Sequence, residues 1–106
     1  MKNRIDGRQR IVDVVYAPGP NWKTGVSFRE QPGVMEHVRH YAKLHEQGNL
    51  LYGGPFTDVD SGGMMVTDGG IAREELEGFA ASDPAVLAGL LICEVKTWYV
   101  AMSKQT

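Results

Sequence analysis

The segment from Gly33 to Phe56, GVMEHVRHYAKLHEQGNLLYGGPF, decides the fold of this chain. Apolar side chains recur through its first half with a period of about 3.6 residues, which predicts an amphipathic helix. The expected buried stripe is Val34, Val38, Tyr41 and His45, with His37 and Leu44 along its edge. The expected polar side is Glu36, His40, Lys43 and Glu46 or Gln47. This pattern predicts a helix that packs on a sheet and carries one imidazole, that of His37, beside its buried face.

A glycine stop and a short strand follow this helix. Gly48 stands where a helix C-cap is expected. The apolar run 50–52 then predicts a strand, which the sequence Gly53-Gly54-Pro55 is expected to end because a proline has no N–H for the ladder. We therefore expect a helix, a tight turn and a strand from this one segment.

The rest of the chain predicts three more strands and a second helix. β-Branched residues mark a strand from Gln9 or Arg10 to Tyr16, and Gly63–Thr67 is expected to form a hairpin with the strand 50–52. A helix is expected over 72–81 and a long strand over 90–102. The order β-α-β-β-α-β is that of the split βαβ, or ferredoxin-like, α+β fold. In this fold a four-stranded antiparallel sheet carries both helices on one face.

Length and composition limit the classes of protein to which this chain can belong. Its 106 residues predict a single domain over 1–106, with a loose tail over 1–8. A net charge of −2 with scattered Lys and Arg provides no basic surface for nucleic acid, and no run is apolar enough for a membrane span. The N-terminal segment is polar and lacks a secretory signal, so we expect a cytoplasmic protein. Cys93 is the only cysteine, which excludes a disulfide or a cysteine zinc site within one chain.

The last strand indicates that the sheet has a partner. Ile92, Trp98 and Val100 are expected on the face of the sheet that the helices leave open, where water is a poor neighbour for them. A domain of this size has a marginal core and often gains stability from a second subunit. Two such sheets packed face to face would form a dimeric α+β barrel, so we expect a homodimer.

His37 and Asp83 are the candidate catalytic residues. An imidazole titrates near neutral pH and suits proton transfer, and a carboxylate on its far nitrogen would fix its tautomer. The alternative for His37 is a half-buried histidine bonded to the backbone. Asp83 precedes Pro84, which is a favourable N-cap and N1 pair for a helix. A carboxylate accepts several hydrogen bonds, so Asp83 can cap a helix and contact His37 at the same time.

A long connection, Ala17 to Pro32, carries two large rings, Trp22 and Phe28. Loops of this length inside compact domains are usually functional or disordered. One interpretation is a surface loop that tucks its rings onto the core, and the other is a lid over a pocket beside the following helix. Gly53, Gly54 and Pro55 would let the backbone approach that pocket closely, with amides near a bound anion or carbonyl and Phe56 and Trp22 as walls. A hairpin exit with unusual backbone angles explains the glycines equally well.

The remaining reactive side chains are expected to be structural. His40 and His37 are spaced as an H-x-x-H pair, but no third ligand has suitable spacing nearby, so we expect no metal site. His45 lies in the last helical turn, where a cation is favoured. Cys93 is expected to be a small buried hydrophobe. No segment has the spacing of a phosphate or dinucleotide loop, and we expect no cofactor.

Several motifs together resemble the YCII-related (YciI-like) proteins, and the likeness extends over residues 10 to 102. They are His37 with Tyr41 and Leu44, then Gly48-x-Leu-Leu-x-Gly-Gly-Pro55, Gly62-Gly63, Asp83-Pro84-x-Val86 and Gly89. The loop GPNWKTGVSFREQPG is similar to the longer entry loop of one branch of that family. The resemblance implies a dimeric α+β barrel, similar in architecture to muconolactone isomerases, with a His–Asp active site that maps onto His37 and Asp83. A few members of the family act on chlorinated hydroxyquinone-type aromatics.

The sequence thus leads to two hypotheses about function. The first is a dimeric enzyme with His37 as general acid and base and Asp83 orienting it, acting as a lyase, isomerase or hydrolase on a small cyclic or aromatic metabolite. Its expected substrate-binding residues are Trp22, Phe28, Tyr41, Gly54, Pro55 and Phe56. The second is a non-catalytic dimer that binds a small ligand or serves as an accessory subunit.

Overall fold

The structure is a computed structural model that describes residues 10–104. The expected loose tail over 1–8 lies outside the described residues. The elements are β1 (Arg10–Pro18), the 3-10 turn η1 (Phe28–Glu30), α1 (Val34–Glu46), β2 (Leu50–Pro55), β3 (Gly63–Thr67), α2 (Arg73–Ala81), α3 (Pro84–Leu87) and β4 (Leu91–Tyr99). Their order along the chain is the one that the sequence predicts, and α3 is the short turn of helix expected after Asp83-Pro84.

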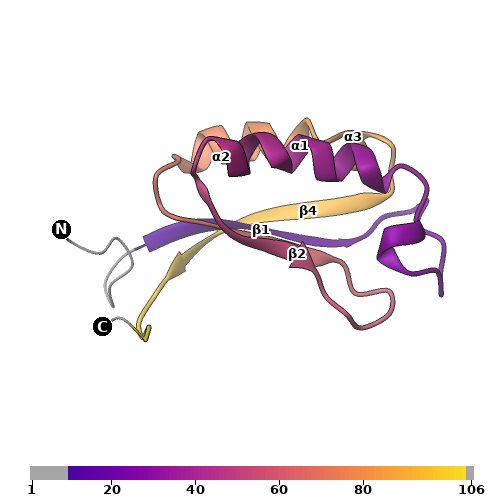
Figure 1. Ribbon diagram of the computed structural model, residues 1–106, viewed down its shortest axis with the longest axis horizontal. Coiled ribbons are helices and arrows are strands. Elements are labelled where there is room, and N and C mark those ends of the chain that lie inside the picture. Colours follow the sequence, from indigo (N-terminus) through magenta and orange to yellow (C-terminus); the bar gives the residue numbers. More distant parts are fainter. Residues whose placement is uncertain (1–9, 105–106) are drawn as a thin grey trace.

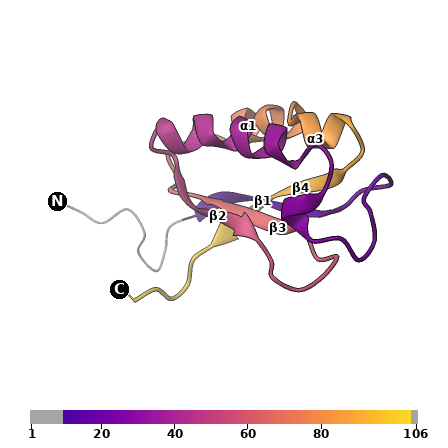
Figure 2. The same cartoon turned by 45° about the vertical axis from the view of Figure 1, so that its right-hand side comes forward.

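The strands form one four-stranded antiparallel sheet in the order β2-β3-β1-β4. All three α-helices lie on one face of the sheet, as Figures 1 and 2 show. This is the ferredoxin-like α+β arrangement, and the predicted fold class is confirmed. β1 is central because it pairs with both β3 and β4, whereas β2 lies at an edge of the sheet.

The ends of two strands differ from the prediction. β2 continues to Pro55 instead of ending at Tyr52. The proline is tolerated because β2 is an edge strand and Pro55 is its last residue, where no ladder N–H is needed. β4 ends at Tyr99, before the predicted end at Met102. A strand ends where its hydrogen bonds to the adjacent strand end. The alternation of side chains along the sequence does not show where that happens.

The buried face of α1 is rotated from the predicted stripe. His40, expected on the polar side, is buried, whereas Val38 is 47% exposed and His45 is exposed. The His40 imidazole stacks on the Phe79 ring at 4.1 Å, and its Nε2 donates to the Phe79 carbonyl oxygen at 2.6 Å. The physical reason is that α2 and α3 cover one side of α1, so the helix buries residues against its neighbours as well as against the sheet.

The main core fills the space between the sheet and the helices. Its largest fully buried side chains include Tyr16 and Val14 of β1, Leu44 of α1, Leu76 of α2 and Leu91 of β4. The edge strand β2 contributes only partly buried Leu50 to this cluster, and a cleft lies between α1 and β2. The candidate site lies there.

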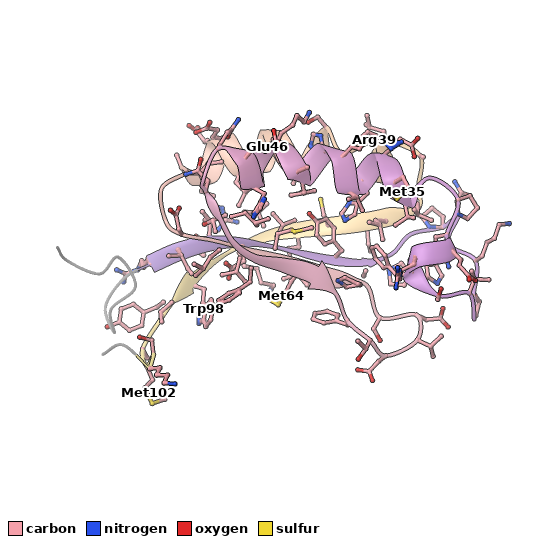
Figure 3. All side chains as sticks on the ribbon, viewed as in Figure 1. Met35, Arg39, Glu46, Met64, Trp98 and Met102 are labelled. Carbon is pink, nitrogen blue, oxygen red and sulfur yellow. The ribbon has the colours of Figure 1, made fainter. Side chains whose placement is uncertain are left out.

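The face of the sheet away from the helices is apolar and largely uncovered. Ile11, Val66 and Val100 form a small buried cluster there, with Met64 packed against it. Ile92 and Trp98 are 54% and 46% exposed. Figure 3 shows Met64 and Trp98 on this side of the sheet. We call it the open face. The predicted placement of Ile92 and Trp98 on an uncovered face is correct, whereas Val100 is buried.

Asp13 is a buried carboxylate in the middle of β1 that the sequence analysis did not single out. It is 4% exposed and lies opposite Val66 of β3 and Lys96 of β4, on the open face. Its Oδ1 has no hydrogen-bond partner among the described residues. Burial raises the pKa of Asp13 to about 6, and a hydrogen bond from the Thr67 backbone offsets part of that rise. A folded-state pKa above the unfolded value means that the charged form destabilises the native state.

The variant Asp13→Asn should therefore be more stable than the wild type near neutral pH. The wild-type penalty is absent below about pH 4, grows as the pH rises to about 6, and is fully present above that. We expect the variant to raise Tm by about 5 °C at about pH 8, with the gain vanishing near pH 4. Thermal unfolding followed by circular dichroism across this range measures it. Asp58→Asn, at an exposed carboxylate in the connection between β2 and β3, is the matched control.

Candidate active site

His37 and Asp83 are in direct contact. His37 Nδ1 lies 2.6 Å from Asp83 Oδ2, although the two residues are 46 positions apart in the chain. His37, from α1, is 3% exposed, and Asp83, at the start of α3, is 0% exposed. The structure therefore brings together the two candidate residues, whose contact the sequence had left open.

The carboxylate is held by the start of α3. Asp83 is the N-cap residue, and its Oδ1 accepts a hydrogen bond of 2.9 Å from the Ala85 backbone N–H. Pro84 occupies the first helical position, as the Asp-Pro pair predicts. Asp83 thus caps the helix with one oxygen and contacts His37 with the other. This arrangement fixes the direction of the carboxylate before any ligand is present.

The contact also determines which nitrogen of His37 can act. An ionised carboxylate only accepts hydrogen bonds, so His37 Nδ1 donates, and in the neutral imidazole Nε2 carries the lone pair. The rings of Tyr16, Phe28 and Tyr41 surround the imidazole, with centroids 5.0, 5.8 and 5.3 Å away. These rings restrict the orientation of His37, so its Nε2 is the nitrogen left to face a ligand.

A cleft of about 530 Å³ lies beside His37, between α1 and β2. Four of the expected substrate-binding residues line it, namely Phe28, Tyr41, Gly54 and Pro55. Tyr16, Val38, His45 and Met65 also line it, and none of them was predicted to bind substrate. Val38 and His45 belong to the helix stripe that was predicted to be buried. Their exposure is explained by this cleft, which lies where the core would otherwise continue.

Trp22 and Phe56 lie outside this cleft, in contrast to the expectation. They line a neighbouring hollow of about 300 Å³ between the long entry loop and the β2–β3 connection. The entry loop places only Phe28 against His37, while Trp22 packs on Phe28 at 5.7 Å between ring centroids. Both rings are partly buried against the main core. The loop thus packs its rings on the core, as the first interpretation expects, and Phe28 also lines the cleft. The lid stays a prediction.

Asp60 ties the entry loop to the β2–β3 connection. Its Oδ1 accepts from the Trp22 indole Nε1 at 2.7 Å and from the Gly25 backbone N–H at 3.0 Å. These donors lower the pKa of the Asp60 carboxyl, with the indole as the larger cause. Asp60 has a φ of 58°, in the left-handed region that non-glycine residues rarely adopt. Asp60 therefore fastens the loop to the β2–β3 connection, while the buried amide of Gln31 bonds Lys23 and Val26 within the loop.

The neighbouring phenols and thiol are not acid–base groups near neutral pH. Burial raises the pKa of Tyr16 and Tyr41 above the usual value, and the two phenols and Asp83 are close enough to affect one another. Neither hydroxyl makes a hydrogen bond of good geometry within the described residues. Burial also raises the pKa of the Cys93 thiol, which agrees with its expected place as a small hydrophobe. His37 is therefore the group of this cluster suited to proton transfer.

Neither a metal site nor a membrane span is found in the part of the chain that the structure describes. From residue 10 to residue 104, no three or more His, Cys, Asp and Glu side chains are arranged to hold a metal ion. The imidazole of His40 points to the Phe79 carbonyl and so does not join His37 in an H-x-x-H site. No helix within the same residues is long and apolar enough to cross a membrane.

Comparison with known proteins adds no relative. No family model matches the chain, and no curated protein matches it. The resemblance to YCII-related proteins stays a prediction. The assignment of the site therefore depends on the geometry around His37 and Asp83.

We expect Asp60→Ala to release the entry loop without unfolding the domain. The variant removes the acceptor for Trp22 and Gly25, so the indole should become more accessible to water. Tryptophan emission in a Trp98→Phe background, which leaves Trp22 as the only tryptophan, should shift to the red and be quenched more strongly by acrylamide. Asp58→Ala, in the same connection, is the control and should leave the emission unchanged. An unchanged emission for Asp60→Ala would contradict the role assigned to Asp60.

Proposed function

We propose that this protein is a small-molecule enzyme, a cytoplasmic homodimer that uses His37 as general base and acid and Asp83 to orient the imidazole. The observation that carries the proposal is the 2.6 Å contact between the two buried side chains beside a cleft. A buried carboxylate paired with an imidazole, with the other ring nitrogen left to a cavity, is the arrangement required for proton transfer. The resemblance to YCII-related proteins supports the same assignment.

The proposed chemistry begins with proton removal by His37 Nε2. The nitrogen takes a proton from a carbon acid, a hydroxyl group or a water molecule in the cleft, and the imidazolium that forms is stabilised by Asp83. Returning the proton to another atom of the substrate gives an isomerase, and loss of a leaving group gives a lyase. Activation of water gives a hydrolase. Proton transfer of this kind needs no cofactor.

The size and lining of the cleft favour a small cyclic or aromatic substrate. A volume of about 530 Å³ lies within the range of small-molecule sites, about 300–1,000 Å³. The walls next to His37 are the rings of Tyr16, Phe28 and Tyr41. Aromatic rings prefer edge-to-face or offset contacts with other rings, so a flat substrate fits beside this imidazole.

Exchange of carbon-bound hydrogen tests this proposal without a known substrate. Small lactones, cyclic ketones and aromatic ketones are incubated with the protein in D₂O, and deuterium incorporation is followed by NMR. We expect exchange with at least one of them to fall at least ~100-fold in His37→Gln and in Asp83→Asn. Asparagine keeps the shape of Asp83 but offers its NH₂ to Nδ1, which reverses the tautomer.

Arg39→Gln is the matched control for the exchange experiment. Arg39 is exposed on α1 and pairs with Glu36 away from the cleft, so its loss should leave exchange unchanged. Near-UV circular dichroism checks that each variant keeps its packing. Exchange that persists in His37→Gln would remove the catalytic role. A ligand that binds in the cleft and is neither exchanged nor converted would favour the alternative function, a non-catalytic binding or accessory protein.

The open face supports the proposed homodimer. Ile92 and Trp98 leave apolar surface exposed there, and Glu94 and Lys96 lie between them on the same face of β4. Opposite charges close together on one strand can pair reciprocally across a two-fold axis, as a symmetric dimer requires. We propose that two sheets pack through this face, which gives the dimeric α+β barrel.

Trp98→Glu should convert the dimer into a monomer. The substitution places a charge in the proposed interface, where it would lose its hydration without gaining a partner. Light scattering coupled to size-exclusion chromatography measures the mass. Leu87→Glu, at an exposed position of α3 on the opposite side of the sheet, should leave the dimer intact. Dimers that survive Trp98→Glu would show that the open face is not the interface.

A further inference from the structure

The cleft beside His37 is poor in charge. None of its lining residues is Asp, Glu, Lys or Arg. Besides phenols, its titratable side chains are two histidines, His37 and His45. Because His37 is already paired with Asp83, the other imidazole of the lining that can donate to an anionic ligand group is that of His45. A phosphate dianion or a dicarboxylate would leave charge unpaired against apolar walls, which is costly.

His45 lies at the far end of the same cleft. It follows His37 by eight positions on α1, which is about 12 Å along a helix. Its side chain is exposed and makes no hydrogen bond or ion pair with any residue from 10 to 104. The sequence analysis explained His45 as a cation that stabilises the helix end. Because His45 also lines the cleft, its imidazole can contact a ligand there.

The edge strand β2 supplies backbone groups to the same cleft. Because β2 pairs only with β3, every second N–H and C=O on its free edge is unpaired within the sheet. Gly53 and Gly54 leave this part of the strand without side chains, and both line the cleft. Such an edge can hydrogen-bond the carbonyl oxygen of a ligand that lies along it.

We propose that the cleft binds an elongated, mainly apolar monocarboxylate, with its carboxylate at His45 and the carbon that loses its proton at His37 Nε2. This inference extends the proposed function, since it names the substrate class of the same site. The apolar and aromatic walls hold the body of the ligand, and the β2 edge holds an oxygen next to the reacting carbon. The separation of the two histidines selects the length of the ligand.

A series of aryl ketones with a carboxylate tail tests the substrate class. The probes are benzoylalkanoates of increasing chain length, each compared with its neutral primary amide by isothermal titration calorimetry. We expect the best carboxylate to bind about tenfold more tightly than its amide, because a hydrogen bond to a charged group is worth about 1.5 kcal/mol. Affinity should pass through a maximum with chain length, since one length spans the two histidines.

His45→Gln and Lys43→Gln separate a local contact from a general charge effect. Both remove a potential cation from the last turn of α1, but Lys43 lies over the Phe79 ring and does not line the cleft. His45→Gln should weaken the carboxylate about tenfold and leave the amide unchanged, while Lys43→Gln should change neither. Equal binding of acid and amide, equal effects of the two variants, or no binding by any probe would overturn the inference.

Deuterium exchange on the same probes distinguishes this inference from the proposed function. Exchange of acid and amide at the same rate, dependent on His37 and indifferent to His45, would keep the catalytic proposal and reject the carboxylate site. Binding that depends on His45 without any exchange would keep the carboxylate site and reject the catalysis. The two proposals can therefore fail separately.

Discussion

The buried contact between His37 and Asp83 is the interaction on which the arrangement of the helices depends. A buried carboxylate or imidazole without a partner is costly, so each side chain requires the other. Asp83 is fixed by the first turn of α3 through Ala85, and His37 belongs to α1. This hydrogen bond therefore joins α1 to α3, which also pack against each other. The same bond that joins the helices also prepares the imidazole for proton transfer.

The cleft exists because the two sides of α1 have different neighbours. One side of the helix packs against α2 and α3, with His40 stacked on Phe79. The side toward the edge strand β2 is less covered, which leaves Val38 and His45 exposed. A sheet with β2 at its edge has no further strand to support core side chains there. The unfilled volume at that edge is where a ligand can reach His37.

The sequence predicted local structure correctly where a residue type strongly favours one structural position. The Asp-Pro pair predicted the start of α3, and the element order predicted the ferredoxin-like sheet. The rotation of α1 was mispredicted because apolar periodicity assumes that the most apolar stripe is buried, and here Val38 faces the cleft. The entry loop was predicted only in part. Its backbone path depends on Asp60, which is 38 positions from Trp22 and gives no local signal.

The sequence by itself determined the fold class and the positions of most elements, and it indicated His37 and Asp83 as candidate residues, because periodicity, capping and turn chemistry are properties of short segments. The contact between these two side chains is a property of the tertiary structure. Only the tertiary structure decided which side of α1 is covered, that the cleft reaches from His37 to His45, and that Asp13 is buried in the sheet. These features depend on which elements lie next to one another. Burial and electrostatic shifts arise from neighbours in space, and those neighbours are set only when the strands and helices have packed.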